Sequence, residues 1–366
     1  MAETALNSSS VESRWLADYM AEYVRSSGFL PYMGRSSNSV IMTKYELQSE
    51  AGKTINMPLI TRLKGAGVAG NTQLEGNEES LGNYNYAISV EWRRHAVTVP
   101  KSESYKTKID LWGAAKEMLR TWEAEQLRDD IIDAMHSIDG VDYAASTSTQ
   151  RNTWVTNNVD RVLFGNSIAN YSATHATALG NCDTTNDKMS AGIVRLAKYV
   201  ARTAGATTGA RIRPYKTESG REYYVMFCGA RTFFNLKSDT TIYNANKDAR
   251  ERGISDNPIF QDGDLIYDGV IIREVPEITE RQLLSGVGAS TADVEPAFLC
   301  GAQAVSIAWG QEPNMITDMT RDYKFRPGVA IEELIGVGKT RFGTGTSSAS
   351  IDHGMVTVYT AAPSVA

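Results

Sequence analysis

The chain has 366 residues, more than the ~250 to 300 at which one hydrophobic core tends to stop growing, so we expect more than one packing unit. Hydrophobic residues make up 42% and charged residues 22%, which argues against a disordered, fibrous or membrane class. With 37 basic and 43 acidic side chains the net charge is -6, so tight sequence-specific DNA binding is not expected.

Cysteine usage and hydropathy indicate a reducing cytosol. Cys182, Cys228 and Cys300 are far apart, odd in number and without a CxxC pair, so they indicate neither a disulfide framework nor a zinc knuckle. The first ten residues are polar and lack the apolar core of a signal peptide. The longest mostly apolar stretch, residues 297–310, is shorter than the ~20 residues that span a bilayer, so no membrane partner is expected.

The N-terminal part of the chain has the pattern of an arm. Residues 11–26 carry apolar side chains at helical spacing, which predicts a short amphipathic helix that ends at Gly28. Residues 29–39 contain Pro31, Gly34 and several serines with little periodicity, as expected for an extended linker. We therefore assign residues 1–36 to an N-terminal arm.

The next part of the chain predicts a long β flap. Two β-prone runs, residues 40–45 and 54–60, flank a turn, and a third run covers residues 84–99. The connection over residues 64–83 contains five glycines and few apolar anchors, so it is expected to project and move. A projecting flap is natural in an assembly, because a neighbour can cover it.

Residues 106–137 show the clearest helical period in the chain, with no proline. At roughly 30 residues this helix would run ~45 Å. Its predicted apolar stripe is Leu111, Ala115, Met118, Trp122, Leu127, Ile131 and Met135. Its predicted solvated face is Lys116, Arg120, Glu123, Glu125, Arg128, Asp129, Asp130 and Asp133, with Arg120–Glu123 and Glu125–Arg128 pairs at i,i+3. Trp112 and Trp122 are expected to pack rather than to bind a cofactor.

The rest of the chain predicts a compact α+β unit. Residues 140–186 are rich in Ser, Thr, Asn and Ala, so we expect loops and short strands there. Beyond them, helices are predicted over residues 191–202 and 230–239. Strands are predicted over residues 223–228, 265–275, 297–308 and 354–360.

Two glycine-rich motifs resemble nucleotide-binding loops. Residues 65–70, GAGVAG, match GxGxxG, but the stretch that follows is polar and broken by glycine, so no helix is expected to meet a pyrophosphate. Residues 336–340, GVGKT, resemble the end of a phosphate-binding loop. The position five before Gly338 is Glu333, however, so the GxxxxGK[ST] motif is not satisfied. A flexible loop and a turn at a strand end are the preferred interpretations.

Charged clusters predict no catalytic or metal site. The acidic group around Glu78 has no histidine nearby and lies in a glycine-rich loop that would not fix ligand geometry. The group of Asp262, Asp264 and Asp268 lacks the ligand spacing of a calcium loop, so both are interpreted as solvated turns. The four histidines form no HExxH pattern, and no GxSxG elbow is present. A basic cluster at residues 93–95 is either a solvated strand end or a contact with DNA phosphates or an acidic neighbouring subunit.

The order of these parts resembles the HK97-like fold of tailed-phage major capsid proteins, an α+β class. The specific resemblance covers roughly residues 40–140 and rests on two stretches. The first is INMPLITRLKGAGVAGNTQLEGNEESLGNYNYAISVEWRRHAV, with the Leu-Glu-Gly-Asn-Glu-Glu segment at residues 74–79, and the second is the helix LWGAAKEMLRTWEAEQLRDDII. Beyond residue 140 the similarity is one of layout.

The resemblance implies a domain plan and a role as a structural protein, not an enzyme. It implies an N-terminal arm (1–36), an E-loop flap (37–104), a P-domain (105–189) with the spine helix, an A-domain (190–320), and a return to the P-domain with a terminal strand (321–366). No catalytic, cofactor or metal residues are assigned. The candidate assembly-interface residues are Lys64, Gly67, Gly70, Leu74, Glu75, Glu78, Glu79, Arg93, Arg94, Trp112 and Trp122.

The expected partner is the chain itself, as hexamers and pentamers of an icosahedral virion shell that encloses double-stranded DNA. Since the arm begins near the start of the chain, a separate scaffolding protein is expected, together with a portal protein and a possible decoration protein, all assembling in the host bacterial cytoplasm. Cross-linking through Lys64 is not expected. The alternatives are an encapsulin-like nanocompartment and, from another class, a nucleotide- or metal-dependent enzyme.

Overall fold

The computed structural model describes the chain from residue 28 to residue 364, apart from several short gaps. The described ranges are residues 28–48, 52–60, 63, 65–80, 83–106, 111–205, 210–217, 220–249, 265–343 and 350–364. The predicted helix over 11–26, most of the predicted arm, Lys64, Asp262 and Asp264 therefore lie outside the described residues. Within the described part, no helix is long and apolar enough to cross a membrane.

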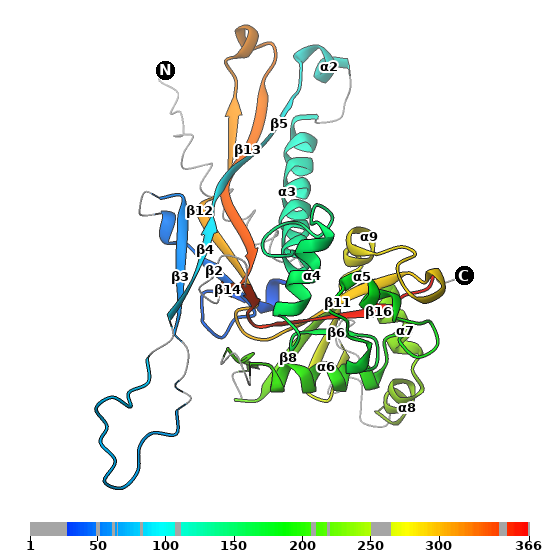
Figure 1. Ribbon diagram of the computed structural model, residues 1–366. Coiled ribbons are helices and arrows are strands. Elements are labelled where there is room, and N and C mark those ends of the chain that lie inside the picture. Colours follow the sequence, from blue (N-terminus) through cyan, green and yellow to red (C-terminus); the bar gives the residue numbers. More distant parts are fainter. Residues whose placement is uncertain are drawn as a thin grey trace.

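Two sheets and one long helix organise the subunit (Figure 1). The smaller sheet has five strands in the order β1 (Met33–Gly34), β2 (Ile41–Lys44), β12 (Val305–Asp318), β13 (Gly328–Lys339) and β5 (Glu91–Thr98). The larger has β6 (Val162–Phe164), β16 (Met355–Ala361), β11 (Val294–Cys300), β8 (Glu222–Cys228), β10 (Val270–Glu274) and β9 (Leu265–Tyr267), with β7 (Tyr215–Lys216) paired to β8.

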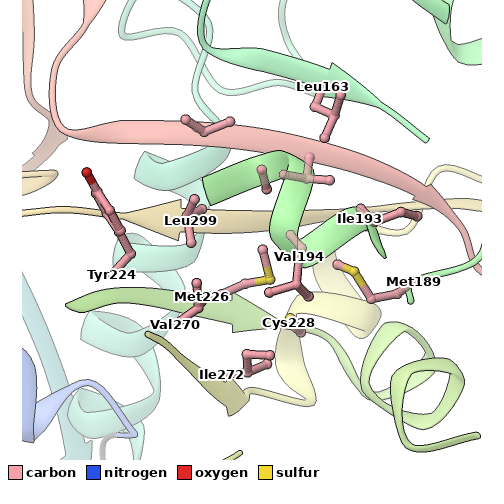
Figure 2. Packing of buried hydrophobic residues seen from close by; sticks show 14 of the residues in the cluster. Leu163, Met189, Ile193, Val194, Tyr224, Met226, Cys228, Val270, Ile272 and Leu299 are labelled. Carbon is pink, nitrogen blue, oxygen red and sulfur yellow. The ribbon is translucent and has the colours of Figure 1, made fainter. Parts of the chain in front are cut away.

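The seven-stranded sheet is buried on both faces, as its apolar strands require. Along β8, Met226 points into one hydrophobic cluster and Phe227 into the other, following the period of two. Helix α6 (Ala191–Thr203) covers the first face, where Ile193 and Val194 belong to the same hydrophobic cluster as Met226 and Leu299 (Figure 2).

Helix α3 (Leu111–His136) connects the two sheets. Its last half packs Leu127, Ile131 and Met135 against the second face of the seven-stranded sheet. Its first half packs Leu119 against Ile331 of β13. The predicted long helix is therefore confirmed over 111–136, while residues 101–106 form a separate helix, α2 (Lys101–Lys106).

Two details of the predicted helix surface were wrong. Met118, assigned to the apolar stripe, is 59% exposed, and Glu123, assigned to the solvated face, is fully buried. Arg93 lies beside Glu123, and Arg128 pairs with Asp129 and Glu277 rather than with Glu125. A helical period alone could not reveal that charged strand residues meet this helix.

The flap is a two-stranded antiparallel ribbon of β3 (Thr54–Ile60) and β4 (Asn83–Ser89). Ile55 lies opposite Ile88, and both side chains point toward a small hydrophobic cluster at the base of the ribbon. The expectation that residues 40–45 belong to the flap was wrong, since β2 pairs in parallel with β1 and β12. The run over 84–99 also divides, because β4 enters the flap and β5 enters the five-stranded sheet.

Residues 140–186 contain more helix than predicted: α4 (Ser148–Asn157) and α5 (His175–Gly180). The polar composition hid α4, which begins with a capping box in which Thr147 and Gln150 bond each other's backbone amide, and which buries Trp154. The predicted strand over 297–308 divides at a turn into β11 and β12, which join different sheets.

The strands of the two sheets do not change over at residues 189/190 and 320/321, where the predicted P-domain, A-domain and return segment meet. Strand β12 belongs to the five-stranded sheet, whereas β6 and β16 pair in parallel in the larger sheet. The remaining helices are α7 (Ala230–Ser238), α8 (Thr240–Ala249) and α9 (Glu277–Gln282), with 3-10 turns at Leu30–Tyr32, Glu46–Gln48, Ile168–Asn170, Ala289–Thr291 and Arg321–Lys324. Strands β14 (Arg341–Gly343) and β15 (Ser350–Asp352) form a separate pair.

Candidate assembly surface

The loop of the flap, residues 65–80, projects away from both sheets (Figure 1). Every residue in it is exposed, including Leu74 at 61%. Gly67 and Gly70 have φ values of +69° and +66°, a left-handed conformation that only glycine adopts without strain, and an added Cβ on either would meet no atom within 4 Å. The loop therefore leaves its apolar side chains uncovered within the subunit.

Hydrogen bonds within the loop define its shape. Glu75 accepts from the Gln73 amide at 3.1 Å, Glu78 accepts from the Gly76 N–H at 2.7 Å, and Glu79 accepts from the Gly65 N–H at 2.5 Å. The three predicted glutamates thus contact the loop itself and also present acidic groups to solvent.

The nucleotide hypothesis for residues 65–70 fails on geometry. None of the described residues from 65 to 80 is helical, so no helix N-terminus is available there to receive a pyrophosphate. The GVGKT motif also lies in a strand end, where Lys339 is buried and pairs with Asp352 at 2.8 Å. Both motifs are structural, as the sequence interpretation favoured.

One face of the five-stranded sheet is open. Helix α3 covers the face to which Arg93 and His95 point, so strand alternation directs Trp92 and Arg94 to the other face. Trp92 is 55% exposed, and Ile316 of β12 is 39% exposed. We define the open sheet face as the exposed Trp92, Arg94 and Ile316 with the half-buried Ala330, Glu332 and Leu334, the last of which packs against the cluster at the base of the flap.

The turn between β12 and β13, residues 319–327, is a second exposed surface that sequence analysis missed. Met319, Tyr323 and Phe325 are exposed, and Tyr323 is fully so. Asp322, Tyr323 and Lys324 all have positive φ, which strains non-glycine residues. The Lys101 N–H donates to the Phe325 carbonyl at 3.0 Å, which holds α2 against this hairpin tip. The β-branched residues Val329, Ile331 and Ile335 at alternate positions were the available signal for the second strand of the hairpin.

One member of the predicted basic cluster, Arg93, is not part of a solvated strand end. Arg93 is largely buried and forms ion pairs with Glu123 and Asp130 of α3 and with Glu333 of β13. Arg94 is exposed and lies opposite Glu332 on the open sheet face. The two neighbouring arginines therefore point to opposite faces, and Arg93 acts within the subunit.

The two predicted tryptophans of α3 are partly buried. Trp122 lies against His95, with ring centroids 4.5 Å apart, and the Lys116 ammonium lies 5.4 Å from the centroid of the Trp112 ring. Both indoles pack beside the cluster of Leu119, Val329 and Ile331. The structure thus places both tryptophans against the five-stranded sheet, and Gly67, Gly70, Leu74 and the glutamates together in the loop.

Buried titratable groups do not form a catalytic set in the described part of the chain. His136 lies between Gln282 at 2.5 Å and Tyr359 at 3.0 Å, and burial lowers its pKa to about 3. The three cysteines are free and buried, and burial raises the pKa of each thiol. Asp268 pairs with Lys198 at 3.2 Å, and no group of three ligands for a metal ion occurs among the described residues.

Two solved phage capsid structures have folds similar to that of this chain. A solved capsid structure from cyanophage Pam1 is 40% identical, covers 94% of both chains and gives a TM-score of 0.83. The capsid of Ralstonia phage GP4 is 24% identical, with a TM-score of 0.70 over 92% of this chain and 90% of that one. The HK97-like class of fold is thereby confirmed.

Sequence comparison gives the same family. The major capsid protein of Pseudomonas phage KPP25 is 28% identical over 344 residues, which is 90% of each chain. The family model described as phage capsid protein matches residues 3–364. The chain therefore belongs to the phage capsid protein family.

Proposed function

We propose that this chain is the major capsid subunit of a tailed phage and that it assembles into a closed icosahedral shell around double-stranded DNA. The observation that carries the proposal is the flap loop, whose sixteen described residues 65–80 are all exposed in the isolated subunit. Extended elements of this kind bury area only against neighbours, so many modest contacts add up in a closed symmetric assembly. Its relatives are capsid proteins, which are structural rather than catalytic.

The flap is assigned as the E-loop, which reaches across a neighbouring subunit. We assign the open sheet face of that neighbour as its docking site, because this face offers exposed apolar area from Trp92 and Ile316. Leu74 supplies an apolar side chain on the loop. The exposed Arg94 also gives the acidic loop a basic contact.

The two sheets correspond to two domains in this proposal. The five-stranded sheet with α3 is assigned as the P-domain, and the seven-stranded sheet with α4 to α9 as the A-domain. The exposed aromatic groups of the hairpin tip and of Tyr105 on α2 then lie at the far end of the P-domain, where copies of the subunit meet. Arg94, Trp112 and Trp122 remain predicted contributors to intersubunit contacts.

Further partners follow from the same role. Hexamers and pentamers of this chain form the shell in the host bacterial cytoplasm, with a portal protein at one vertex, a separate scaffolding protein during assembly and a possible decoration protein outside. The net charge of -6 suits a wall that encloses DNA without adhering to it. The phage relatives favour a virion over an encapsulin-like nanocompartment.

The test is negative-stain electron microscopy of the purified full chain, alone and coexpressed with the neighbouring phage proteins. Closed shells or capsomer rings are expected. A variant lacking residues 67–77 should unfold at the same temperature but form no particles, since every residue removed is exposed in the isolated subunit. A second variant with a Gly/Ser linker of equal length separates the loss of reach from the loss of Leu74 and the glutamates.

A persistent wild-type monomer under both conditions would overturn the capsid proposal. Normal particle yield from the shortened variant would overturn only the role of the loop. Purified particles that contain a cargo protein and no DNA would identify a nanocompartment instead.

A further inference from the structure

Four charged side chains meet where α3 crosses the five-stranded sheet. Arg93 comes from β5, Glu333 from β13, and Glu123 and Asp130 from α3. Arg93 donates through Nε to Glu333 and through one terminal nitrogen to Asp130, while its other terminal nitrogen lies 3.6 Å from Glu123. With all groups ionised, three carboxylates would share a single guanidinium.

Two of these carboxylates are deeply buried. The side chains of Glu123 and Glu333 are 1% and 0% exposed, whereas that of Asp130 is 37% exposed. With Glu123 ionised, both of its oxygens and one oxygen of Glu333 accept no hydrogen bond from a donor in the described chain. A buried carboxylate without donors is strongly disfavoured, and such a group takes up a proton instead of remaining charged.

The proton is best held by Glu123. Burial, a hydrogen bond with Glu333 and the negative charge of Glu333 raise the pKa of Glu123 to about 9, against the opposing charge of Arg93. Burial also raises the pKa of Asp130, again against Arg93. The neighbouring carboxylates raise the pKa of Arg93 despite its burial, so this side chain remains cationic. One proton reduces the formal charge of the cluster from -2 to -1.

We propose that Arg93, Glu123, Asp130 and Glu333 form a proton-dependent latch that holds the first half of α3 to strands β5 and β13. The latch is closed while Glu123 carries a proton that it donates to Glu333. When the proton is lost, two buried carboxylates face each other across a guanidinium that already serves Glu333 and Asp130. The helix and the sheet then repel each other at this point.

The position of the cluster determines which part of the subunit responds. The second half of α3 is anchored by Leu127, Ile131 and Met135 in a large hydrophobic cluster of the seven-stranded sheet. The first half has a smaller cluster around Leu119 and Ala115. Loss of the proton therefore loosens the first half of α3 from the five-stranded sheet and leaves its second half in place. This inference concerns the fold of one subunit and does not depend on shell assembly.

The sign of the pH effect follows from the raised pKa. An unfolded chain releases the Glu123 proton near its ordinary value of 4.5, whereas the folded chain keeps it to about 9. The folded state thus binds more protons in this range, so the contribution to stability is complete below pH 4.5 and falls as pH rises to about 9. A glutamine at this position imitates the protonated acid and removes the dependence.

The test is thermal unfolding of the full chain, unassembled, at pH 7 and pH 9.5. Between these pH values the wild type should lose about 3 to 6 °C more than Glu123→Gln does. Glu117→Gln, at an exposed position of the same helix, is the matched control and should behave like the wild type. Amide exchange, corrected for the intrinsic effect of pH, should rise at alkaline pH in residues 111–126 more than in residues 131–136, and only when Glu123 is present.

An equal loss in the wild type and in Glu123→Gln would overturn the latch, as would uniform exchange along α3. If Glu123→Gln does not fold, Glu333→Gln gives the same test, because removing the charge that raises the pKa of Glu123 should shift the alkaline loss of the wild type to lower pH or abolish it. An unchanged profile in Glu333→Gln would also reject the latch. Failure to form shells in a separate assay bears on the proposed function alone.

Discussion

The seven-stranded sheet and the flap differ in how far they bury their apolar side chains. Strands β11 and β16 are buried along their whole length, with apolar side chains in three hydrophobic clusters of one subunit. Strand β3 buries only Ile55 and Met57 well, and the loop that follows it is exposed throughout. The sheet is buried within one chain, whereas the loop of the flap is left exposed.

This difference separates stability from assembly. Removing atoms from the clusters of the sheet should lower the free energy of unfolding, because the surrounding side chains close such cavities only in part. Changes in the loop should leave that free energy almost unaltered and act on association. Substitutions at different distances from the core of the seven-stranded sheet test this separation.

The largest effect is expected for Trp154→Ala. Trp154 is 1% exposed, donates through Nε1 to Asp352 at 2.9 Å and lies beneath the Lys339 ammonium, which pairs with Asp352. Its removal opens a cavity next to a buried ion pair, so a loss of about 3 to 5 kcal/mol is expected. Urea unfolding followed by circular dichroism measures it.

The exposed Thr156 on the same helix supplies the control, since Thr156→Ala should change the free energy of unfolding by less than about 0.5 kcal/mol. A loss below about 1 kcal/mol for Trp154→Ala would mean that this part of the core is not a cooperative unit with the sheet.

The sequence was sufficient where local pattern and tertiary packing agree. Helix α6 was predicted over 191–202 and extends over 191–203, because its apolar stripe faces the sheet in a single direction. The terminal strand was located within one residue at each end. The long helix, the projecting loop and the absence of a helix after GAGVAG likewise follow from periodicity and glycine content.

Sequence pattern failed where partners come from distant segments. The burial of Glu123 depends on Arg93 and on Glu333, which is more than 200 residues further along the chain. Likewise, the assignment of β2 to the five-stranded sheet depends on pairing with β12. The hairpin tip was missed because the predicted strand over 297–308 stopped before most of β12, and no strand was assigned to β13.

An intermediate effect is expected at Trp122, which packs against the five-stranded sheet and belongs neither to the core of the seven-stranded sheet nor to the flap. A fully buried indole would cost about 3 to 5 kcal/mol on truncation. Trp122 is only partly buried and contacts His95, so Trp122→Ala should cost about 1 to 2 kcal/mol. Chemical denaturation of the unassembled chain provides the value.

Met118→Ala provides the comparison on the same helix, because Met118 is 59% exposed and its truncation should cost less than about 0.5 kcal/mol. Equal losses at the two positions would show that Trp122 does not pack against the sheet. A loss of more than about 3 kcal/mol would place it in the core instead.

The smallest effect concerns acid sensitivity, which distinguishes the packed core from the α3 junction. Burial lowers the pKa of His175 to about 4, with the charge of Arg151 acting in the same direction. The unfolded chain gains this proton near pH 6.5 while the folded chain does not, so stability falls as pH decreases from 6.5 toward 4. Glu123 has the opposite dependence, since its raised pKa stabilises the fold as pH decreases.

Because these contributions oppose each other, the histidine effect is measured as a difference between two chains. His175 lies among Tyr143, Trp154, Phe164 and Tyr359, so phenylalanine fits its surroundings without a titratable group. Between pH 7 and pH 5.5, His175→Phe should lose about 1 kcal/mol less than the wild type in urea unfolding. Equal losses of unfolding free energy in the wild type and in His175→Phe would show that His175 is protonated inside the folded chain. The core would then tolerate a charge, as the α3 junction does.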